Sequence, residues 1–254
     1  MLSVQNVAVR LGRSAILHDV SLTACAGSLT AIVGPNGSGK TTLLRALTGD
    51  VPFSGSATLN GRNIARADPA DLAGIRAVVA QSTQLAFPFT VLEVVRLGLR
   101  HGGDALAIQA LSDVGLGAHA GRDMQTLSGG EQSRVHLARA LVQVWQPADD
   151  DGPRWFFLDE PVAALDIGHQ LLVMKIARRF ADAGGGVIAV MHDLNLSAMF
   201  ADQIVLLHGG RVKAQGAPSQ VLTNALLSDA YDCTVRVGCA PASGPWLVPQ
   251  AMEA

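Results

Sequence analysis

A glycine-rich segment near the N-terminus constrains the fold of this chain more than any other feature. It follows the short apolar run Leu29–Val33, which predicts a buried strand, and it opens Lys40–Leu47, whose leucine spacing predicts a helix. The segment fits the pattern G-x-x-x-x-G-K-S/T in full and reads Gly34-Pro35-Asn36-Gly37-Ser38-Gly39-Lys40-Thr41. Glycines let a backbone wrap around phosphate oxygens with its N–H groups pointing inward, and the helix N-terminus adds its dipole. An ordinary glycine-rich turn does not explain this strand–turn–helix context, so the sequence predicts a phosphate-binding loop.

Two residues of this loop and two acids elsewhere predict catalytic chemistry. We expect Lys40 to reach the terminal phosphates and the hydroxyl of Thr41 to ligate Mg²⁺. The apolar run 155–158 predicts a second buried strand, which ends in Asp159 and Glu160. Ligands of α/β folds bind beyond the carboxyl ends of the strands, so we expect Asp159 to hold Mg²⁺ through water and Glu160 to polarise an attacking water. Two acids after a strand are more often a solvated edge, and only the phosphate-binding loop makes them informative.

A third motif opens a predicted helix and reads Leu127-Ser128-Gly129-Gly130-Glu131. Ser128 and Glu131 have the spacing of a capping box, which alone would indicate a well-capped helix. That interpretation does not explain two adjacent glycines in the first turn, because glycine costs helix stability. Bare N–H groups at a helix N-terminus form an anion site, and we expect the anion to be a phosphate.

The rest of the chain alternates between predicted strands and helices, which is typical of a mostly parallel α/β core. From about Phe87 to Val144 the pattern is helical and interrupts this core. The polar run 146–153 indicates a solvated connection, and the tail 226–254 is weakly patterned. The further predicted elements are strands at 75–80, 187–191 and 204–207, a turn at Gly209-Gly210, and a helix at 170–181.

Composition excludes several classes of protein. The 254 residues are 49% hydrophobic, enough for one substantial core or a core with a small lobe. A net charge of -2 offers no basic stripe for nucleic acid. The longest strand-like apolar runs fall far short of the roughly 20 residues that a membrane-spanning helix needs, and the first residues lack the pattern of a secretory signal. Cys25, Cys233 and Cys239 form no metal-binding pair, so we expect reduced thiols in the cytosol.

The order of these motifs, together with Gln81 and His192, resembles the nucleotide-binding domains of ABC transporters over nearly the whole chain. The run from Leu127 to Glu131 is similar to that family's signature and is more specific than the phosphate-binding loop. The resemblance implies an α/β fold: a P-loop NTPase (RecA-like) core with a small antiparallel β subdomain and an inserted α-helical subdomain. It implies one domain, 1–254, with the core at 1–85 and 154–225, the helical subdomain and loop at 86–153, and the tail at 226–254.

The resemblance also implies a site shared by two copies of the chain with ATP and Mg²⁺ bound. Two copies would stack head to tail, so that Ser128 and Gly129 of one close on the γ-phosphate held by Lys40 of the other. Ala164-Leu165-Asp166 resembles the D-loop, which lies across the dimer interface. The implied catalytic residues are Glu160 as the base, His192 as the switch histidine on the γ-phosphate, Gln81 and Lys40. The implied nucleotide contacts are Gly34, Pro35, Asn36, Gly37, Ser38, Gly39, Lys40, Thr41, Thr42, Ser128, Gly129, Gly130, Glu131 and Asp166, and the implied metal contacts are Thr41, Gln81 and Asp159.

Two positions depart from the family pattern. Leu11-Gly12 stands where the family places an aromatic residue that stacks on adenine, which predicts looser selectivity for ATP over GTP. The usual Glu-Pro-Thr-Ser-Ala-Leu-Asp run appears as Glu160-Pro161-Val162-Ala163-Ala164-Leu165-Asp166. The loss of two hydroxyls removes local hydrogen bonds but no catalytic group.

The residues after Gln81 favour one branch of the family. The run 81–91 and the stretch 192–196 resemble ATPases of importers of haem, iron chelates and vitamin B12, closest to the haem importers. Phe87 and Phe89 stand where such subunits receive a coupling helix of the permease, and each is equally well explained as a core residue. The remaining histidines have no metal-ligand spacing and are expected on the surface or in the core: His18, His101, His119, His136, His169 and His208.

The resemblance implies a homodimer on two permease subunits, at the cytoplasmic face of the inner membrane, with an extracytoplasmic substrate-binding protein and no nucleic acid. Substrate choice would lie in the permease and the binding protein, so a siderophore or vitamin B12 importer remains an alternative. A soluble ABC ATPase of translation or DNA repair usually carries two cassettes or a long coiled-coil insertion, which this chain lacks. A pure nucleotide-binding regulator would lack a competent base, and Glu160 argues against it.

Overall fold

The computed structural model describes residues 1–81, 87–163 and 165–247. The expectations for Ser82, Thr83, Gln84, Leu85 and Ala86 after Gln81, for Ala164 of the D-loop, and for the end of the tail at 248–254 lie outside these residues. Within the described ranges, no helix is long and apolar enough to cross a bilayer.

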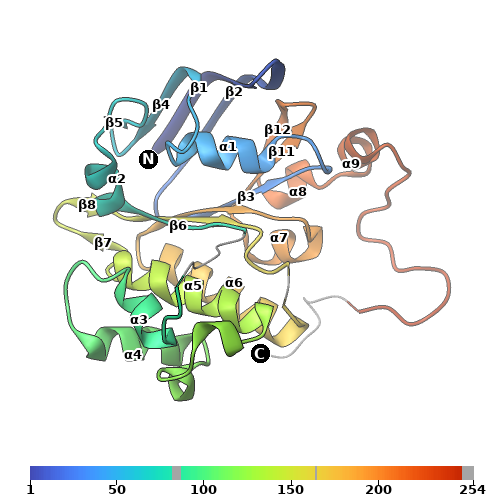
Figure 1. The fold of residues 1–254 in the computed structure, drawn as a ribbon. Helices are drawn as coiled ribbons and strands as arrows, with labels where there is room; N and C mark the ends of the chain where they lie inside the picture. The colour runs from blue at the N-terminus through green and yellow to red at the C-terminus, as the bar shows by residue number, and fades with distance from the viewer. Residues whose placement is uncertain (82–86, 164, 248–254) are drawn as a thin grey trace.

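A six-stranded sheet runs through the middle of the molecule in the order β12-β11-β3-β10-β9-β6 (Figure 1). Neighbouring strands pair in parallel except β11 and β12, which the Gly209-Gly210 turn joins as an antiparallel hairpin. The three central strands are buried along their whole length, which explains their continuous apolar sequences. The six strands are β3 Leu29–Val33, β6 Arg76–Val79, β9 Trp155–Asp159, β10 Gly186–Val190, β11 Gln203–His208 and β12 Arg211–Gly216.

Successive residues of each central strand face opposite sides of this sheet, so they divide between two cores. Phe157 packs in the core that holds α1 (Lys40–Leu47) and a second, antiparallel sheet of order β2-β1-β4-β5. Phe156 packs in the other core, which the remaining large helices cover (Figure 1). The strands of the second sheet are β1 Leu2–Leu11, β2 Ser14–Ala24, β4 Ser54–Leu59 and β5 Arg62–Asn63.

The helical subdomain lies between β6 and β9 in the chain and packs beneath the six-stranded sheet (Figure 1). It contains α3 Val91–Arg96, α4 Asp104–Asp113, the short 3-10 helices η1 Gly117–His119 and η2 Met124–Thr126, and α5 Gly129–Gln143. Thr90 and Ser128 each cap their helix through a reciprocal capping box with a glutamate three residues on. The other helices are α2 Pro69–Ile75, α6 Ile167–Asp182, α7 Leu194–Phe200, α8 Pro218–Val221 and α9 Asn224–Tyr231.

The fold class implied by the resemblance is confirmed, and the individual elements differ from prediction in three places. The run 146–153 contains a short hairpin of β7 Ala148–Asp149 and β8 Gly152–Pro153, where Gly152 takes a φ of 108° at the turn. The helix predicted from residue 170 begins at Ile167, because the side chain of Asp166 caps it. The tail, predicted to be weakly patterned, begins within a helix, α9, that has buried apolar residues.

Candidate active site

The phosphate-binding loop joins β3 to α1, and its glycines have conformations that other residues adopt only with strain. Gly34, Gly37 and Gly39 have φ values of 150°, 77° and 100°. A Cβ atom on Gly34 would lie 2.0 Å from the carbonyl oxygen of Leu207, and one on Gly39 would lie 2.7 Å from the side chain of Leu17. Gly37 has open space around it. The loop therefore has no room for a side chain at Gly34, where the neighbour is backbone, and its conformation disfavours other residues at all three glycines.

Lys40 is buried at the start of α1 and folds back onto the loop. Its Nζ donates to the carbonyl oxygens of Gly34 at 2.8 Å and Pro35 at 3.0 Å. Burial lowers the pKa of this ammonium, and the charges of Glu160 and Asp159 oppose that shift. Both carbonyl acceptors are neutral, so neither brings a full negative charge to the buried ammonium, and two opposite unit charges at contact distance attract each other more strongly. A bound polyphosphate would therefore be a better partner for this side chain than the loop itself.

Asp159 ends β9 beside the loop, as the sequence predicts. It is buried, and the hydroxyl of Thr41 donates to its Oδ1 at 3.2 Å. Burial raises the pKa of this carboxyl, and the Thr41 hydrogen bond opposes the rise. A hydroxyl and a carboxylate are hard oxygen ligands of the kind Mg²⁺ takes. No cluster of three or more His, Cys, Asp or Glu among the described residues could hold a metal by itself, so a cation here would need phosphate or water ligands too.

The carboxylate of Glu160 contacts two side chains, His192 and Gln81, each of which follows a different strand of the sheet. Its Oε1 lies 2.6 Å from Nε2 of His192, and its Oε2 accepts from Nε2 of Gln81 at 2.8 Å. The backbone of Glu160 is left-handed, with a φ of 50°, and its N–H donates to the carbonyl of Val190 at 3.1 Å. Non-glycine residues in this region carry strain and cluster at functional sites. The conformation turns the chain after Asp159, so two successive carboxylates serve different partners.

His192 is held in place by the segment between β10 and α7. The next residue, Asp193, caps α7 by accepting from the backbone N–H groups of Asn195 at 2.7 Å and Leu196 at 2.9 Å. The imidazole stays 44% exposed, whereas the side chain of Glu160 is 13% exposed. The histidine therefore lies at the solvent side of the carboxylate, where a ligand could reach it.

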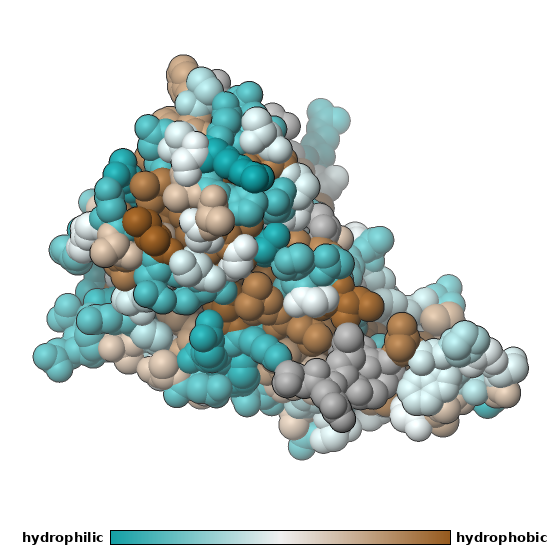
Figure 2. Space-filling model, turned by 90° about the horizontal axis from the view of Figure 1, so that it is seen from below, coloured by the Kyte–Doolittle hydropathy of each residue, from teal (hydrophilic) through white to brown (hydrophobic). Residues whose placement is uncertain are grey.

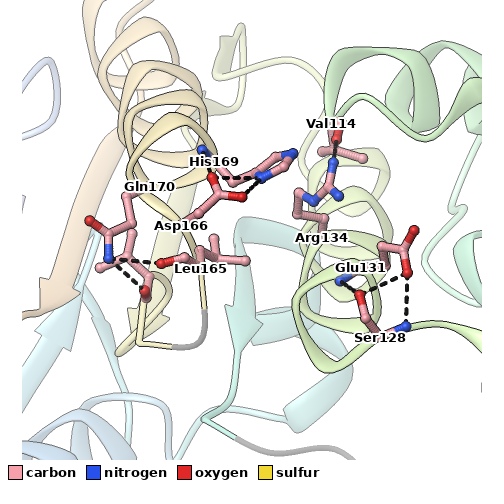
Figure 3. Close-up of polar contacts among 9 residues, drawn as sticks. Val114, Ser128, Glu131, Arg134, Leu165, Asp166, His169 and Gln170 are labelled. Atoms are coloured by element: carbon pink, nitrogen blue, oxygen red, sulfur yellow. Dashed lines mark hydrogen bonds and ion pairs between the residues drawn. The ribbon is translucent and has the colours of Figure 1, made fainter. Parts of the chain in front are cut away.

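The signature serine sits at the N-terminus of α5 (Figure 3). Glu131 Oε2 accepts from the backbone N–H of Ser128 at 2.8 Å and from its hydroxyl at 2.7 Å. These bonds lower the pKa of Glu131, with His119 at 3.6 Å adding to the effect. The capping-box interpretation is thus correct as structure, and it leaves the glycine N–H groups of the first turn available to an anion.

Asp166 caps the neighbouring helix α6 in a comparable way (Figure 3). Its Oδ1 accepts from the backbone N–H of His169 at 2.9 Å, and both carboxylate oxygens lie 2.8 Å from Nδ1 of the same histidine. These bonds lower the pKa of Asp166. Arg134 of α5 lies between the two caps, is buried, and donates to the carbonyl of Val114 at 2.9 Å. The charge of Arg134 also contributes to the lowered pKa of Asp166.

The structure brings most predicted side chains together but keeps two groups apart. Thr41 meets Asp159, and Gln81 and His192 meet Glu160. The run from Ser128 to Glu131 belongs to the helical subdomain, and no hydrogen bond or ion pair of the described residues joins it to the phosphate-binding loop. A single chain therefore supplies two incomplete halves of the expected site.

Sequence reasoning missed the partners of these motifs. His119 and His169 were expected to be ordinary surface or core residues, and they lie against Glu131 and Asp166. The i,i+3 spacing of Asp166 and His169 was the available signal.

The sequence left open whether Phe87 and Phe89 are core residues or exposed ones, and the structure separates the two. Phe89 packs against the core, whereas Phe87 is 68% exposed and meets Phe89 edge-on with ring centroids 6.5 Å apart.

Leu11, at the place of the expected aromatic residue, is 44% exposed on the end of β1. An aliphatic side chain there provides less stacking surface than an aromatic ring.

The chain is similar to known proteins in both sequence and fold. The model of the family described as ABC transporter matches residues 17–163. The chain is 58% identical over 245 residues to the hemin import ATP-binding protein HmuV of Jannaschia sp., covering 95% of this chain and 91% of that protein. It is 51% identical over 259 residues to the protein of the same name from Rhizobium meliloti, covering 99% of each.

Two solved structures, each 26% identical, have the same fold. A bacterial Atm1-family ABC exporter with ATP bound superposes with a TM-score of 0.80 over 91% of this chain, which spans 41% of the exporter chain. A dimeric ATP-binding cassette in a post-hydrolysis state with ADP and Pi superposes with a TM-score of 0.74, over 86% of this chain and 99% of that one.

Proposed function

Because this chain belongs to the ABC transporter family, we propose that it is the ATP-hydrolysing subunit of a haem importer. The proposed ATPase activity is supported by the position of the Glu160 carboxylate, which His192 and Gln81 hold beside the phosphate-binding loop. The haem assignment is supported by relatives that are 51% and 58% identical over nearly their full length.

Binding of ATP begins with a change of partner at Lys40. Its ammonium leaves the carbonyls of Gly34 and Pro35 and pairs with the terminal phosphates, since a charged acceptor makes the stronger hydrogen bond. The glycine N–H groups of the loop and the N-terminus of α1, including Thr42, line the same phosphates. Thr41 and Asp159 would hold Mg²⁺, which neutralises charge on the phosphate oxygens when it is bound.

Hydrolysis is carried out by the side chains of Glu160, Gln81 and His192. The carboxylate accepts a proton from the attacking water, and the hydrogen bond from Gln81 fixes its orientation. His192, on the exposed side of the carboxylate, is free to turn toward the γ-phosphate and stabilise its developing charge. The chain turns after Asp159 through the left-handed backbone of Glu160, and the two carboxylates have different partners: Thr41 contacts Asp159, whereas Gln81 and His192 contact Glu160.

Two copies of the chain complete the site. In one copy the run from Ser128 to Glu131 and the phosphate-binding loop lie on different subdomains, so a second copy, turned head to tail, supplies the helix N-terminus of α5 to the γ-phosphate. Arg134 of α5 lies between Asp166 and the Ser128 cap in Figure 3, and the proposal assigns both caps to the dimer interface. The dimeric cassette among the similar structures supports this arrangement.

The permease contact is proposed for the groove between α2 and the helical subdomain. The groove has a volume of about 460 Å³ and is lined by apolar and charged side chains, among them Ile75, Leu106, Trp145, Asp71 and Arg100. Its wall includes the C-terminal end of α5, whose N-terminus carries the signature. A helix of 15 residues is about 22 Å long, so α5 links the groove to the ATP of the partner copy as one rigid element.

Exposed apolar side chains on the helical subdomain provide a further candidate surface for the permease. Phe87, Leu97 and Ile108 are exposed by 68%, 61% and 44%. Figure 2, seen from the side of this subdomain, shows hydrophobic residues gathered across the middle of the surface with hydrophilic ones around them. The proposal places the homodimer on two permease subunits at the cytoplasmic face of the inner membrane, with an extracytoplasmic binding protein beyond.

The test is hydrolysis of ATP by the subunit reconstituted in liposomes with the permease encoded beside it. Haem-loaded binding protein should stimulate hydrolysis, and binding protein loaded with ferric siderophore or vitamin B12 should not. Stimulation by a siderophore or vitamin B12 would move the assignment to another importer of the same group. Indifference to all three would refute the importer, while activity of the isolated subunit would preserve the ATPase.

A further inference from the structure

A glutamine of α5 holds the segment that leads into the signature. The Nε2 of Gln132 donates to the carbonyl oxygens of Leu127 at 3.1 Å and Met124 at 3.2 Å. The N–H of Leu127 also donates to the Met124 carbonyl at 3.3 Å, which closes a turn just before the cap Ser128. The backbone N–H of Gln132 donates to the Ser128 carbonyl at 2.9 Å. One residue therefore ties the first turn of α5 to the turn that precedes it.

The N-terminus of α6 is built in the same way (Figure 3). The Nε2 of Gln170 donates to the carbonyl oxygens of Leu165 at 3.0 Å and Val162 at 3.3 Å. The N–H of Leu165 donates to the Val162 carbonyl at 3.2 Å, and the N–H of Gln170 donates to the carbonyl of the cap Asp166 at 2.8 Å. In both helices the two carbonyls lie five and eight residues before the glutamine that holds them.

The glutamine amides set the direction from which the chain enters each helix. The caps Ser128 and Asp166 are extended, with ψ values of 158° and 165°, so the chain changes direction at each cap. Met124, Leu127 and Val162 are buried, and a buried carbonyl oxygen needs a donor. These carbonyls precede the helices, so the hydrogen bonds within the helices do not serve them. The amides supply donors there and fix each entering segment against its helix.

A third glutamine makes the same kind of contact in another place. The Nε2 of Gln143, at the C-terminal end of α5, donates to the carbonyl oxygens of Ala73 at 2.9 Å and Arg76 at 3.0 Å. Ala73 lies in α2 and Arg76 begins β6, so this side chain joins α5 to the core and holds neither cap. The three glutamines therefore differ in what they hold and not in how they hold it.

We propose that Gln132 and Gln170 are positioning residues, which hold the signature and the D-loop in the orientation that meets the ATP of a second copy. The inference rests on the proposed head-to-tail dimer, in which Ser128 and Asp166 lie at the interface. Neither glutamine touches ATP, and each acts through the cap that follows the segment it holds. Preorganised segments make the closing of two copies more favourable, because ordering a loose segment would subtract from the free energy of closing.

The test replaces each glutamine by methionine in the full chain. Methionine is unbranched and forms helices well, but it has no N–H donor. Two hydrogen bonds of ordinary net strength shift the population of the held conformation by about fivefold to 150-fold, so kcat should fall by a factor in that range in Gln132→Met and Gln170→Met. Calorimetric titration without Mg²⁺ should give both variants the ATP affinity of the wild-type monomer, because Lys40 and its loop are unchanged.

Gln143→Met is the matched control, since it removes two hydrogen bonds of the same kind from the same helix as Gln132. In the isolated subunit its kcat should equal that of the wild type, while urea titrations should show a similar loss of stability in all three variants. A fall in kcat confined to Gln132→Met and Gln170→Met therefore separates positioning from general support of the fold.

Dimer formation gives the second readout. In the Glu160→Gln background, Gln132→Met and Gln170→Met should each raise the ATP concentration for half-maximal dimer at least fivefold, and Gln143→Met should not. Equal kcat and equal dimer formation in all three variants would overturn the inference, as would a fall in kcat matched by an equal fall in monomer ATP affinity. Failure of Glu160→Gln alone to form a dimer with ATP would instead refute the proposed dimer.

Discussion

Replacing Glu160 by glutamine should separate hydrolysis from ATP binding, because the change keeps the size of the side chain and removes its charge. In the structure one carboxylate oxygen lies 2.6 Å from Nε2 of His192 and the other accepts from Gln81 at 2.8 Å. The amide oxygen of a glutamine can still accept from Gln81, and its NH₂ group can donate to the unprotonated Nε2 of His192. The cluster therefore keeps its geometry and loses its base.

The size of the expected fall in kcat follows from the loss of the general base. A positioned general base contributes about 10²- to 10⁴-fold, so kcat should fall by that factor, or by about 2.7–5.4 kcal/mol in activation free energy. Contacts to phosphate come from Lys40 and the loop, so ATP affinity should change little. ATP then persists at the interface and holds two copies together.

Two assays decide the outcome. Phosphate release measures kcat, and size-exclusion chromatography with Mg-ATP measures the dimer. We expect Glu160→Gln to release almost no phosphate and to elute as a dimer. Hydrolysis close to the wild-type rate would refute the role of Glu160 as the base, and a monomer with ATP bound would refute the trapped interface.

Three further predictions concern the loop, the signature and the permease face. Ser128→Arg should abolish hydrolysis and leave the ATP affinity of the monomer nearly unchanged; an equal loss in a binding titration would contradict the arrangement in which the signature serves the other copy. Gly34→Ala should lower the free energy of unfolding by about 2–4 kcal/mol in urea titrations, because its Cβ meets the backbone of Leu207, whereas Gly37→Ala has open space and should cost about 1 kcal/mol. Phe87→Ala should weaken co-purification with the permease without changing stability, and Met199→Ala, an exposed apolar change on α7 outside the helical subdomain, is its control; equal losses in both would remove the special role of Phe87.

Local patterns predicted much of the fold. The run Leu29–Val33 and the helix Lys40–Leu47 have the predicted bounds, because a continuous apolar strand and a leucine-spaced helix can each be recognised from a few residues. The β7–β8 hairpin was missed because each of its strands has two residues, too few to show a period. The start of α6 was placed late because Asp166 was read as part of a loop and not as a helix cap.

The candidate site was predictable as a set of residues and not as a set of contacts. Motif order named Glu160, Gln81 and His192, but their hydrogen bonds join residues 79 and 32 positions apart. The left-handed backbone of Glu160 is likewise set by the sheet, through its bond to Val190, and not by its own propensity.

ATP-driven accumulation of haem inside proteoliposomes tests the central claim most directly. The complete complex, with the permease, both copies of this subunit and haem-loaded binding protein, should accumulate haem only with Mg-ATP. The same complex carrying Glu160→Gln should bind ATP and accumulate none. Haem uptake by the Glu160→Gln complex at the wild-type rate, or hydrolysis of ATP by the wild type with no haem uptake, would contradict the account.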